Sequence, residues 1–564
     1  MANSATTDAR RTTAPGFDAA IDELASGAKQ IRSMPLGKQR ELVDACVAGV
    51  ARNATAWVEA ACRAKQIPLH TSLASEEILA GPTSLLRYLR LLSRSLREIE
   101  ANGAPTLPGE PRKNAQGRTC IPVLPIASLY DNVIFLGLGA EVWLSPDAHD
   151  QSLFADQFVS NNNRSPSICG VLGAGNVSAI PATDTLYKIF NDGEAVLLKL
   201  NPVNDYLESP FNDAFRPLID ANLLRIVRGG HEAGEAIVKH PRIDTLHITG
   251  SHLTHDAIVW GSDADERVRR QQSGKPLVTK PITSELGNVT PWIVVPGRYT
   301  KRQLRAQAEH VVASIVNNAS FNCVATKMIV TSRTWPQRNE FLNLVEASLQ
   351  SVPPRFAYYP GAHIRFERAT GQASPDRSDG TLPWTLIRDS RIETSPHLFE
   401  EESFVCVCAE TTLDESSPEA FVDASVEFVN DRLFGTLCAT LTLPNNFQRQ
   451  HRATLDQAIQ RLCYGSVCIN QWAGVVYGTM TPPWGAYPGA TIADPQSGIG
   501  SVHNTFRIKN VEKTVLWGPL CNTPKPVWFP SHRTAHQVAW SLMRLYEHPS
   551  LTRLPSIFYH ALRG

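Results

Sequence analysis

Three side chains suited to covalent catalysis lie beside apolar runs in the middle of the chain. Cys323 lies in "ASFNCVATK" just before the run "KMIVTS", and Asn176 lies in "GAGNVSA". Glu285 lies in "SELGN" between two predicted strands, "PLVTKPI" and "TPWIVVP". A thiolate is a strong nucleophile, a carboxylate accepts a proton, and an amide donates to an oxygen that gains charge. Each residue alone also has an ordinary explanation, as a small core residue, a loop carboxylate and a turn former.

The segments around these residues predict parallel α/β structure. From about residue 168, short apolar runs such as "SICGVLGAG", "AVLLKLNP" and "IDTLHITGS" alternate with helical stretches. This alternation is typical of a doubly wound parallel sheet. A second α/β stretch begins near residue 290. Its first helix carries Leu304, Ala308, Val311 and Ile315 on one face, and "KMIVTS" follows as a strand.

The first part of the chain has a different pattern. Residues 17–100 predict helices, with Leu42, Cys46, Val50 and Ala54 on one stripe. Residues 101–130 are punctuated by Pro and Gly and predict a loop. The most apolar run, residues 133–144, is short and contains Glu141, so it indicates a strand or core segment and not a membrane span.

Composition excludes several classes of protein. The chain has 564 residues, too many for one core, and its 54 basic and 54 acidic side chains cancel. Nothing therefore predicts a nucleic-acid partner or an acidic lipid partner. The eleven cysteines contain no C-x-x-C pair, so neither a disulfide framework nor a metal site is expected. The polar N-terminus lacks the apolar core of a signal peptide, and a reducing cytoplasm is the expected compartment.

Taken in order, a longer set of residues resembles the aldehyde dehydrogenase superfamily across roughly residues 30–515. The interval from Asn176 to Lys199 matches the family, and Glu285 precedes Cys323 by slightly more than usual. "FEEESF" resembles the family's Glu-Glu-x-Phe signature. "GSVCINQW" and the glycine-rich residues 484–500 resemble its closing segments. The other members of the set are "RGG" at 228–230 and "TGS" at 249–251.

The resemblance implies an α/β fold in three parts. A helical region and a doubly wound NAD(P)-binding domain would occupy residues 1–292, and an α/β catalytic domain would occupy residues 293–495. A small bridging oligomerisation element would include the region around 131–168 and return in residues 496–564. The expected assembly is a homodimer or homotetramer.

The resemblance also assigns a reaction and its residues. An aldehyde would be oxidised to a carboxylic acid with NAD or NADP through a thiohemiacetal and a thioester on Cys323. Glu285 would be the base, since an ordinary thiol with a pKa of about 8.5 is only ~3% ionised at neutral pH. Asn176 and the backbone N–H of Cys323 would bind the oxyanion. The expected cofactor contacts are Lys199, Gly230, Gly234, Ser251, Glu402 and Phe404.

Four features depart from the family pattern. Val177-Ser178 replaces an aromatic–proline pair, which alters the substrate tunnel and suggests a bulky or apolar aldehyde. Pro202 stands where NAD-preferring relatives often carry a glutamate, so NAD and NADP both remain candidates. Residues 263–276 predict a charged, exposed insertion.

The fourth departure is a C-terminal extension of about 47 residues. Val538, Leu542, Leu545 and Tyr546 predict one buried helix face within it. It would dock on a neighbouring subunit or form a lid over the substrate entrance. Two alternative functions also stay open, a CoA-acylating dehydrogenase and a non-catalytic scaffold of the same fold.

Overall fold

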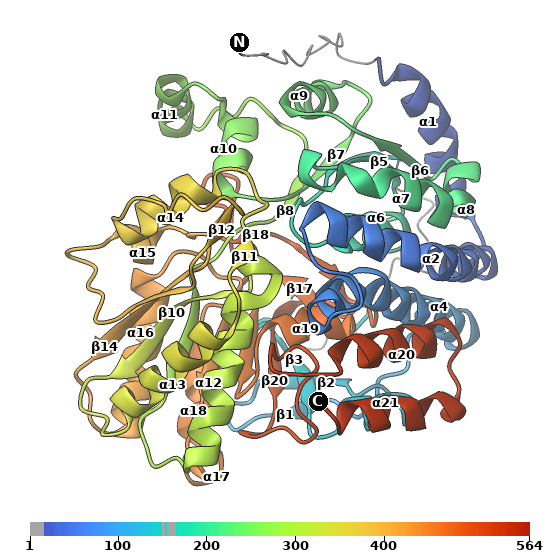
Figure 1. Ribbon diagram of the computed structural model, residues 1–564. Coiled ribbons are helices and arrows are strands. Elements are labelled where there is room, and N and C mark those ends of the chain that lie inside the picture. The colour runs from blue at the N-terminus through green and yellow to red at the C-terminus, as the bar shows by residue number, and fades with distance from the viewer. Residues whose placement is uncertain (1–15, 149–152, 155–164) are drawn as a thin grey trace, which may run out of the picture.

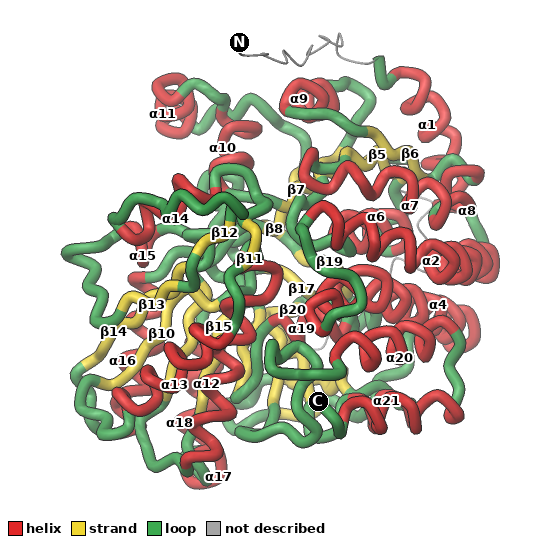
Figure 2. The backbone as a smooth tube through the Cα atoms, viewed as in Figure 1, coloured by secondary structure: helices red, strands yellow, loops and turns green. Residues whose placement is uncertain are grey.

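Two β-sheets surrounded by helices organise the protein (Figures 1 and 2). The computed structural model describes residues 16–148, 153–154 and 165–564. Within these residues, no helix combines the length and apolar character that a membrane crossing needs.

The smaller sheet is the doubly wound sheet that the sequence predicts. Its strand order is β18-β8-β7-β4-β5-β6, and every neighbouring pair is parallel except β18 and β8. Strand β4 lies between β5 and β7, so the winding reverses there. Ligands of open α/β sheets bind beside such a reversal, at the carboxyl ends of the strands. The strands are β4 (Ile168–Leu172), β5 (Ala195–Lys199), β6 (Leu224–Val227), β7 (Thr245–Thr249), β8 (Ile282–Glu285) and β18 (Gly498–Ile499).

Both faces of this sheet are covered, which explains the unbroken apolar runs of its strands. Leu197 packs in a cluster with residues of α1 and α9, while Val196 and Leu198 join the main core with residues of α2 and α6. The helical elements of this region are α6 (Ile180–Phe190), η5 (Pro202–Leu207), α7 (Glu208–Ala214), α8 (Arg216–Asp220), α9 (His231–Lys239), α10 (His252–Trp260) and α11 (Ala264–Ser273). Helix α11 has no buried residue, so the prediction of an exposed insertion at 263–276 is confirmed.

The larger sheet has the order β1-β2-β3-β20-β16-β15-β9-β10-β14-β13. Strands β20 to β13 run parallel, and β3, β2 and β1 add to β20 as antiparallel neighbours. The strands are β1 (Arg112–Lys113), β2 (Thr119–Leu124), β3 (Gly139–Leu144), β9 (Thr290–Val294), β10 (Thr326–Ser332), β13 (Thr385–Ile387), β14 (Val407–Leu413), β15 (Cys438–Thr442), β16 (Ser466–Ile469) and β20 (Val511–Trp517).

The predicted helix–strand pair before and after Cys323 is confirmed by α12 and β10. The remaining elements of this region are α12 (Lys301–Val316), η6 (Asn317–Ser320), α13 (Arg338–Ser351), β11 (Arg355–Phe356), α14 (Ala362–Thr370), β12 (Thr381–Leu382), α15 (His397–Glu400), α16 (Pro418–Arg432), α17 (Phe447–Gln450), α18 (Arg452–Arg461), α19 (Gly474–Thr479), β17 (Pro483–Gly485) and β19 (Ser501–His503).

Three local predictions need correction. Residues 101–130 are not all loop, because Thr119–Leu124 pairs with β3 and buries Ile121 and Val123 despite the surrounding Pro and Gly. The run 133–144 is divided, since helix α5 (Leu129–Ile134) ends inside it and β3 begins only at Gly139. "PLVTKPI" is mostly loop, and strand β8 begins at its last residue, Ile282.

The N-terminal helices pack on both faces of the smaller sheet, with α1 in the cluster of Leu197 and α2 in the main core. Of the predicted stripe, Cys46, Val50 and Ala54 are buried and Leu42 lies at its edge. A π-helical turn, η2, interrupts the path between α2 and α4 at Gly81-Pro82. The elements are α1 (Asp18–Ser33), α2 (Leu36–Ala64), η1 (Ser72–Ala74), α3 (Ser75–Ile78), η2 (Leu79–Thr83) and α4 (Ser84–Asn102).

The C-terminal extension packs on its own chain. It forms α20 (Ala535–Glu547), η7 (Leu551–Arg553) and α21 (Leu554–Ala561), with α20 beside α4 (Figure 1). Arg90 of α4 donates to the carbonyl oxygen of Tyr546 at 2.9 Å and also to that of Glu547. These bonds satisfy carbonyls that the end of a helix leaves without partners.

Candidate active site

Cys323 and Glu285 come from different sheets and meet at one point. Cys323 lies in the turn between η6 and β10, and Glu285 is the last residue of β8. The thiol donates a hydrogen bond to Oε1 of Glu285, with 3.4 Å between sulfur and oxygen. The structure therefore brings together the predicted nucleophile and the predicted base.

The environment of Glu285 holds its proton near neutral pH. Burial, followed by the charge of Asp184, raises the pKa of Glu285 from its ordinary value to about 7. In the described part of the chain, its second oxygen, Oε2, is buried without a hydrogen-bond partner. A carboxyl group with this pKa exchanges protons readily at neutral pH, as general base catalysis requires.

The Cys323 thiol is neutral at rest. Burial raises its pKa well above the ordinary value, and the carboxylates of Glu285 and Glu402 raise it further. A thiol in this setting reacts only when a base removes its proton during attack. Since Glu285 is the group that accepts its hydrogen bond, the geometry matches that need.

Asn176 lies on the other side of the nucleophile turn. Its side-chain amide donates to the carbonyl oxygen of Phe321 at 3.1 Å, which leaves the second amide hydrogen for another acceptor. Among the described residues, the backbone N–H of Cys323 has no hydrogen-bond acceptor. The two predicted oxyanion donors are thus adjacent in the fold and have unused hydrogens.

The turn before Cys323 has an unusual backbone. Asn318, Ala319 and Ser320 have φ values of 52°, 54° and 68°, the left-handed region that costs non-glycine residues energy. Lys327, which is buried, holds the end of this segment by donating to the carbonyl and hydroxyl oxygens of Ser320 at 3.1 and 2.9 Å. A strained segment that is held in this way is typical of an active site.

Lys199 occupies the carboxyl end of β5, beside the reversal in winding. Its side chain is buried, which lowers its pKa, and its only hydrogen bond in the described chain is a long one of 3.4 Å to the carbonyl of Leu200. An ammonium with unused hydrogens at this edge fits hydroxyl acceptors such as those of a ribose.

The predicted glycines and Ser251 lie at the starts of two helices near the same edge. Gly230 precedes α9, and an added Cβ there would meet nothing within 4 Å. At Gly234 an added Cβ would lie 3.7 Å from Lys199, an ordinary contact. The Ser251 hydroxyl caps α10 by accepting from the Thr254 N–H, lies 3.0 Å from the Thr254 hydroxyl, and so marks a helix N-terminus of the kind that binds anions.

Glu402 and Phe404 lie beside the turn that carries Cys323. An added Cβ at Gly287 would be 2.1 Å from the Glu402 carboxylate, so this side chain needs the glycine that follows Glu285 and Leu286. Burial raises the pKa of Glu402, and the Lys327 ammonium opposes the rise. Phe404 packs against Phe321, with 5.9 Å between ring centroids.

A cavity of about 1080 Å³ reaches Cys323 and Glu285. Val177 and Ser178, the residues that depart from the family pattern, lie on its wall. Much of the remaining wall is apolar and belongs to the C-terminal extension and the loop before it. These residues are Trp528, Phe529, Val538, Leu542, Tyr546, Ile557 and Phe558.

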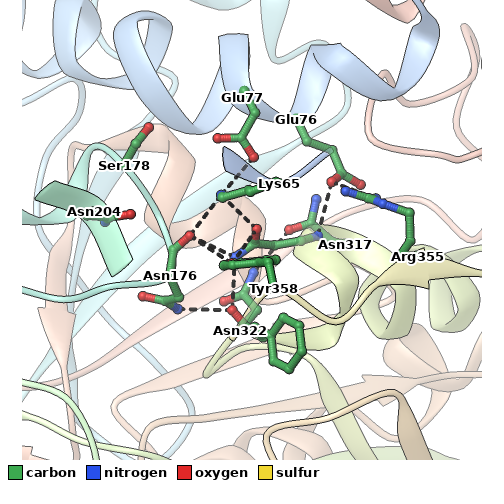
Figure 3. Close-up of polar contacts among 12 residues, drawn as sticks. Lys65, Glu76, Glu77, Asn176, Ser178, Asn204, Asn317, Asn322, Arg355 and Tyr358 are labelled. Carbon is green, nitrogen blue, oxygen red and sulfur yellow. Dashed lines mark hydrogen bonds and ion pairs between the residues drawn. The ribbon is translucent and has the colours of Figure 1, made fainter. Parts of the chain in front are cut away.

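Sequence patterns did not predict a buried polar cluster behind Asn176. Lys65, Glu77, Asn318 and Tyr358 converge there, as Figure 3 shows for the labelled residues. Lys65 ends a helix more than a hundred residues before Asn176, so no local motif marks it. The Asn-Asn pair at 317–318 is the one available signal, because Asn tolerates the left-handed region better than other side chains.

Comparisons with known proteins find similarity to one family. A sequence model of the aldehyde dehydrogenase family matches residues 168–355. Aldehyde dehydrogenase LUC3 of Fusarium sp. is 25% identical over 28% of this chain and 31% of its own length. Hydroxyisobutyraldehyde dehydrogenase of Mycolicibacterium austroafricanum is 24% identical over 52% of this chain and 55% of its own. The matches thus span about half or less of these two relatives.

The fold comparison covers far more of the chain. The crystal structure of an indole-3-acetaldehyde dehydrogenase in complex with NAD+ aligns with 88% of this chain and 87% of that one, with a TM-score of 0.58 and 16% identity. At this identity the match shows the fold and not the substrate. Residues 168–355 thus match the aldehyde dehydrogenase family, and the fold of the chain is similar to that of a solved aldehyde dehydrogenase.

Proposed function

We propose that the protein oxidises an aldehyde to a carboxylic acid with NAD+ or NADP+, using Cys323 as nucleophile and Glu285 as base. The observation that carries this proposal is the 3.4 Å contact between the thiol and a carboxyl group whose pKa is about 7. A nucleophile bonded to a base with a matched pKa is the arrangement that covalent catalysis needs.

The proposed steps follow from the positions of these groups. Glu285 takes the thiol proton as the sulfur bonds to the aldehyde carbon. The carbonyl oxygen becomes an oxyanion and accepts hydrogen bonds from the Asn176 amide and the Cys323 N–H. A nicotinamide held beside the site by residues such as Glu402 and Phe404 would supply the hydride acceptor, and loss of the hydride would leave a thioester on Cys323. Glu285 then removes a proton from a water molecule that attacks the thioester and releases the acid.

The residues of the smaller sheet fit a dinucleotide. Lys199 has unused ammonium hydrogens for ribose hydroxyls, Gly230 and Gly234 leave open backbone, and Ser251 begins a helix suited to phosphate. Glu402 and Phe404 would hold the nicotinamide end. Pro202 offers no carboxylate to the adenosine ribose, which is why NAD and NADP both belong to the proposal.

We further propose a bulky or apolar aldehyde as substrate. The support is the apolar part of the cavity wall, including Leu542 and Phe558 of the extension, together with the small Val177-Ser178 pair beside Asn176. Such a substrate loses water contact on entry, and burial of its apolar surface would supply binding energy of about 25 cal/mol per Å².

The parts of the chain take corresponding roles in this proposal. Residues 1–292 would bind the cofactor, residues 293–495 would carry the nucleophile, and residues 496–564 would return to the bridging element and add the extension. We also retain a cytoplasmic location and a homodimer or homotetramer as proposals. The strands around 139–144 and 511–517 join the chain's own large sheet, so an assembly would use surfaces beyond these ladders.

A screen of NAD(P)H formation over aldehydes of varied length and aromaticity tests the function. The proposal predicts activity without CoA and its loss in Cys323→Ala, with cofactor affinity nearly unchanged. Activity only in the presence of CoA would favour an acylating dehydrogenase. Cofactor binding without turnover of any aldehyde would favour a scaffold that kept the fold.

A further inference from the structure

Lys65 is a buried cation placed between two loops that come from different parts of the fold. It follows α2 and is 2% exposed, although an ammonium is rarely buried without good reason. Its Nζ donates to the carbonyl oxygen of Asn176 at 2.9 Å, to Oδ1 of Asn318 at 2.9 Å, and to Oε1 of Glu77 at 2.8 Å (Figure 3). Since an ammonium has three hydrogens, none remains for a substrate, although Lys65 borders the cavity.

The two loops that Lys65 joins carry the two oxyanion donors. Asn176 belongs to the loop after β4, and Asn318 opens the left-handed segment that leads to Cys323. Asn318 in turn donates from Nδ2 to the backbone oxygen of Asn176 at 3.0 Å and to that of Phe321 at 2.9 Å. Phe321 is also the acceptor that orients the Asn176 amide.

Neighbouring groups add further hydrogen bonds to the cluster. The Tyr358 hydroxyl lies 3.0 Å from Oδ1 of Asn318 and 3.2 Å from the Asn176 carbonyl. Glu76 accepts from the Asn318 N–H at 3.1 Å and pairs with Arg355 at 3.2 Å. The left-handed backbone of Asn318 is thus held from both its main chain and its side chain.

From these contacts we infer that Lys65, held by Glu77, is a positioning residue that sets the spacing between the Asn176 amide and the Cys323 N–H. The inference rests on the proposed function, because it assigns a use to the same oxyanion site. Lys65 acts through Asn176 and Asn318 and touches no reacting atom. A shift of about 1 Å in such donors is enough to reduce a rate by about 100-fold.

Two reactions at the same thiol separate this role from a purely structural one. Acylation of Cys323 by p-nitrophenyl acetate forms an S–C bond, passes through an oxyanion and expels p-nitrophenolate. Alkylation by iodoacetamide displaces iodide and forms no oxyanion. Both reactions need the ionised sulfur, and only acylation forms an oxyanion. The ratio of the acylation rate to the alkylation rate therefore reports on the oxyanion donors. Rates measured in Cys323→Ala supply the background from the other cysteines.

In Lys65→Met, acylation is expected to slow by about 10- to 100-fold while alkylation changes by less than about 2-fold. Tyr358→Phe removes one hydroxyl without changing the shape, and acylation is expected to slow by about 3-fold. The control is Lys513→Met, because the Lys513 ammonium is also buried and binds three carbonyls, those of Ile459, Gln460 and Leu462, away from the cavity. It is expected to lower thermal stability and leave the ratio unchanged.

The inference is overturned if both reactions slow equally in Lys65→Met, or if neither slows. If that variant does not fold, an unchanged ratio in Tyr358→Phe overturns it. A wild-type protein that the ester does not acylate also overturns it. If the wild type is acylated and the ratio falls as expected, but no aldehyde yields NAD(P)H, the positioning role stands and the proposed function fails.

Discussion

The Glu285 carboxyl group can exchange a proton with the Cys323 thiol or with water. Burial raises its pKa to about 7, while the Cys323 thiol is held neutral. The carboxylate form is therefore the active one. We expect kcat/KM of the wild type to rise with pH and to level off above an apparent pKa of about 7. In Glu285→Gln the rate should fall by about 10²–10⁴-fold, and the rise of kcat/KM with pH should disappear.

Steady-state and burst kinetics between pH 5.5 and 9 check this expectation. If Glu285 mainly activates water, the variant keeps a burst of reduced cofactor that is followed by a slow steady state. A variant with the wild-type rate and the wild-type pH profile would contradict the assignment of the base.

The same raised pKa makes a prediction about stability. Below pH ~4.5 the carboxyl group is protonated in both the folded and the unfolded chain and costs nothing. Between pH ~4.5 and pH 7 the unfolded chain ionises this group while the folded protein keeps its proton, so the folded state loses stability across this window. The cost approaches about 3 kcal/mol above pH 7, from 1.36 kcal/mol per pKa unit.

Glu285→Gln should therefore be more stable than the wild type at pH 8 and nearly equal at pH 5. Urea unfolding followed by fluorescence at both pH values measures the difference. A variant that is less stable at pH 8 would show that the carboxylate is paired in the fold by a group that compensates its burial.

At the scale of elements, helix α20 forms part of the cavity wall. Leu542 and Leu545 lie on the same helix and are both buried, but only Leu542 borders the cavity. Truncation of either to Ala should cost about 2–4 kcal/mol of stability. Only Leu542→Ala should change selectivity, with KM for long or aromatic aldehydes rising by about 3- to 10-fold relative to a short aldehyde, because apolar contact is lost.

Kinetics on a short aldehyde and a long one, with Leu545→Ala as the matched control, decide the role of the extension. Equal KM ratios in the two variants and the wild type would mean that α20 only stabilises the fold. The interpretation of the extension as a substrate wall would then be wrong.

The elements also show how far sequence patterns reach. Helix α12 follows from periodicity, because its predicted apolar face is buried, and strand β10 follows from a short apolar run that is buried along its whole length. Strand β2 could not be predicted from its own composition, because it is formed by pairing with β3, which lies beyond the Pro-rich loop. Lys65 was missed for the same physical reason: its partners Asn176 and Asn318 lie 111 and 253 positions away.

At the scale of the whole molecule, the site forms where the two sheets meet. Glu285 ends β8 in the smaller sheet, and β9 of the larger sheet begins five residues later at Thr290. Cys323 reaches Glu285 from the larger sheet, so the catalytic pair exists only when both sheets are folded and in register. The order of motifs along the sequence predicted this meeting. The addition of β1, β2 and β3 to the large sheet of the same chain was not predicted.

The cofactor edge of the smaller sheet gives a prediction for the intact protein. A ligand at about 100 times its Kd stabilises the folded state by about 2.7 kcal/mol. NAD+ or NADP+ should therefore raise Tm, and Lys199→Met should reduce that rise, because an ammonium that meets ribose hydroxyls is removed. Thermal unfolding with each nucleotide measures this without any aldehyde. An equal rise in the variant would contradict the role of Lys199.

The most direct test of the central claim is the covalent adduct on Cys323. The wild-type protein is mixed with NAD+ or NADP+ and an apolar aldehyde, quenched in acid during the first turnover and digested for mass spectrometry. The peptide containing Cys323 should gain the mass of the aldehyde less two hydrogens, in step with the reduced cofactor formed. Reduced cofactor without an acylated Cys323, or an acyl group on a different residue, would contradict the account.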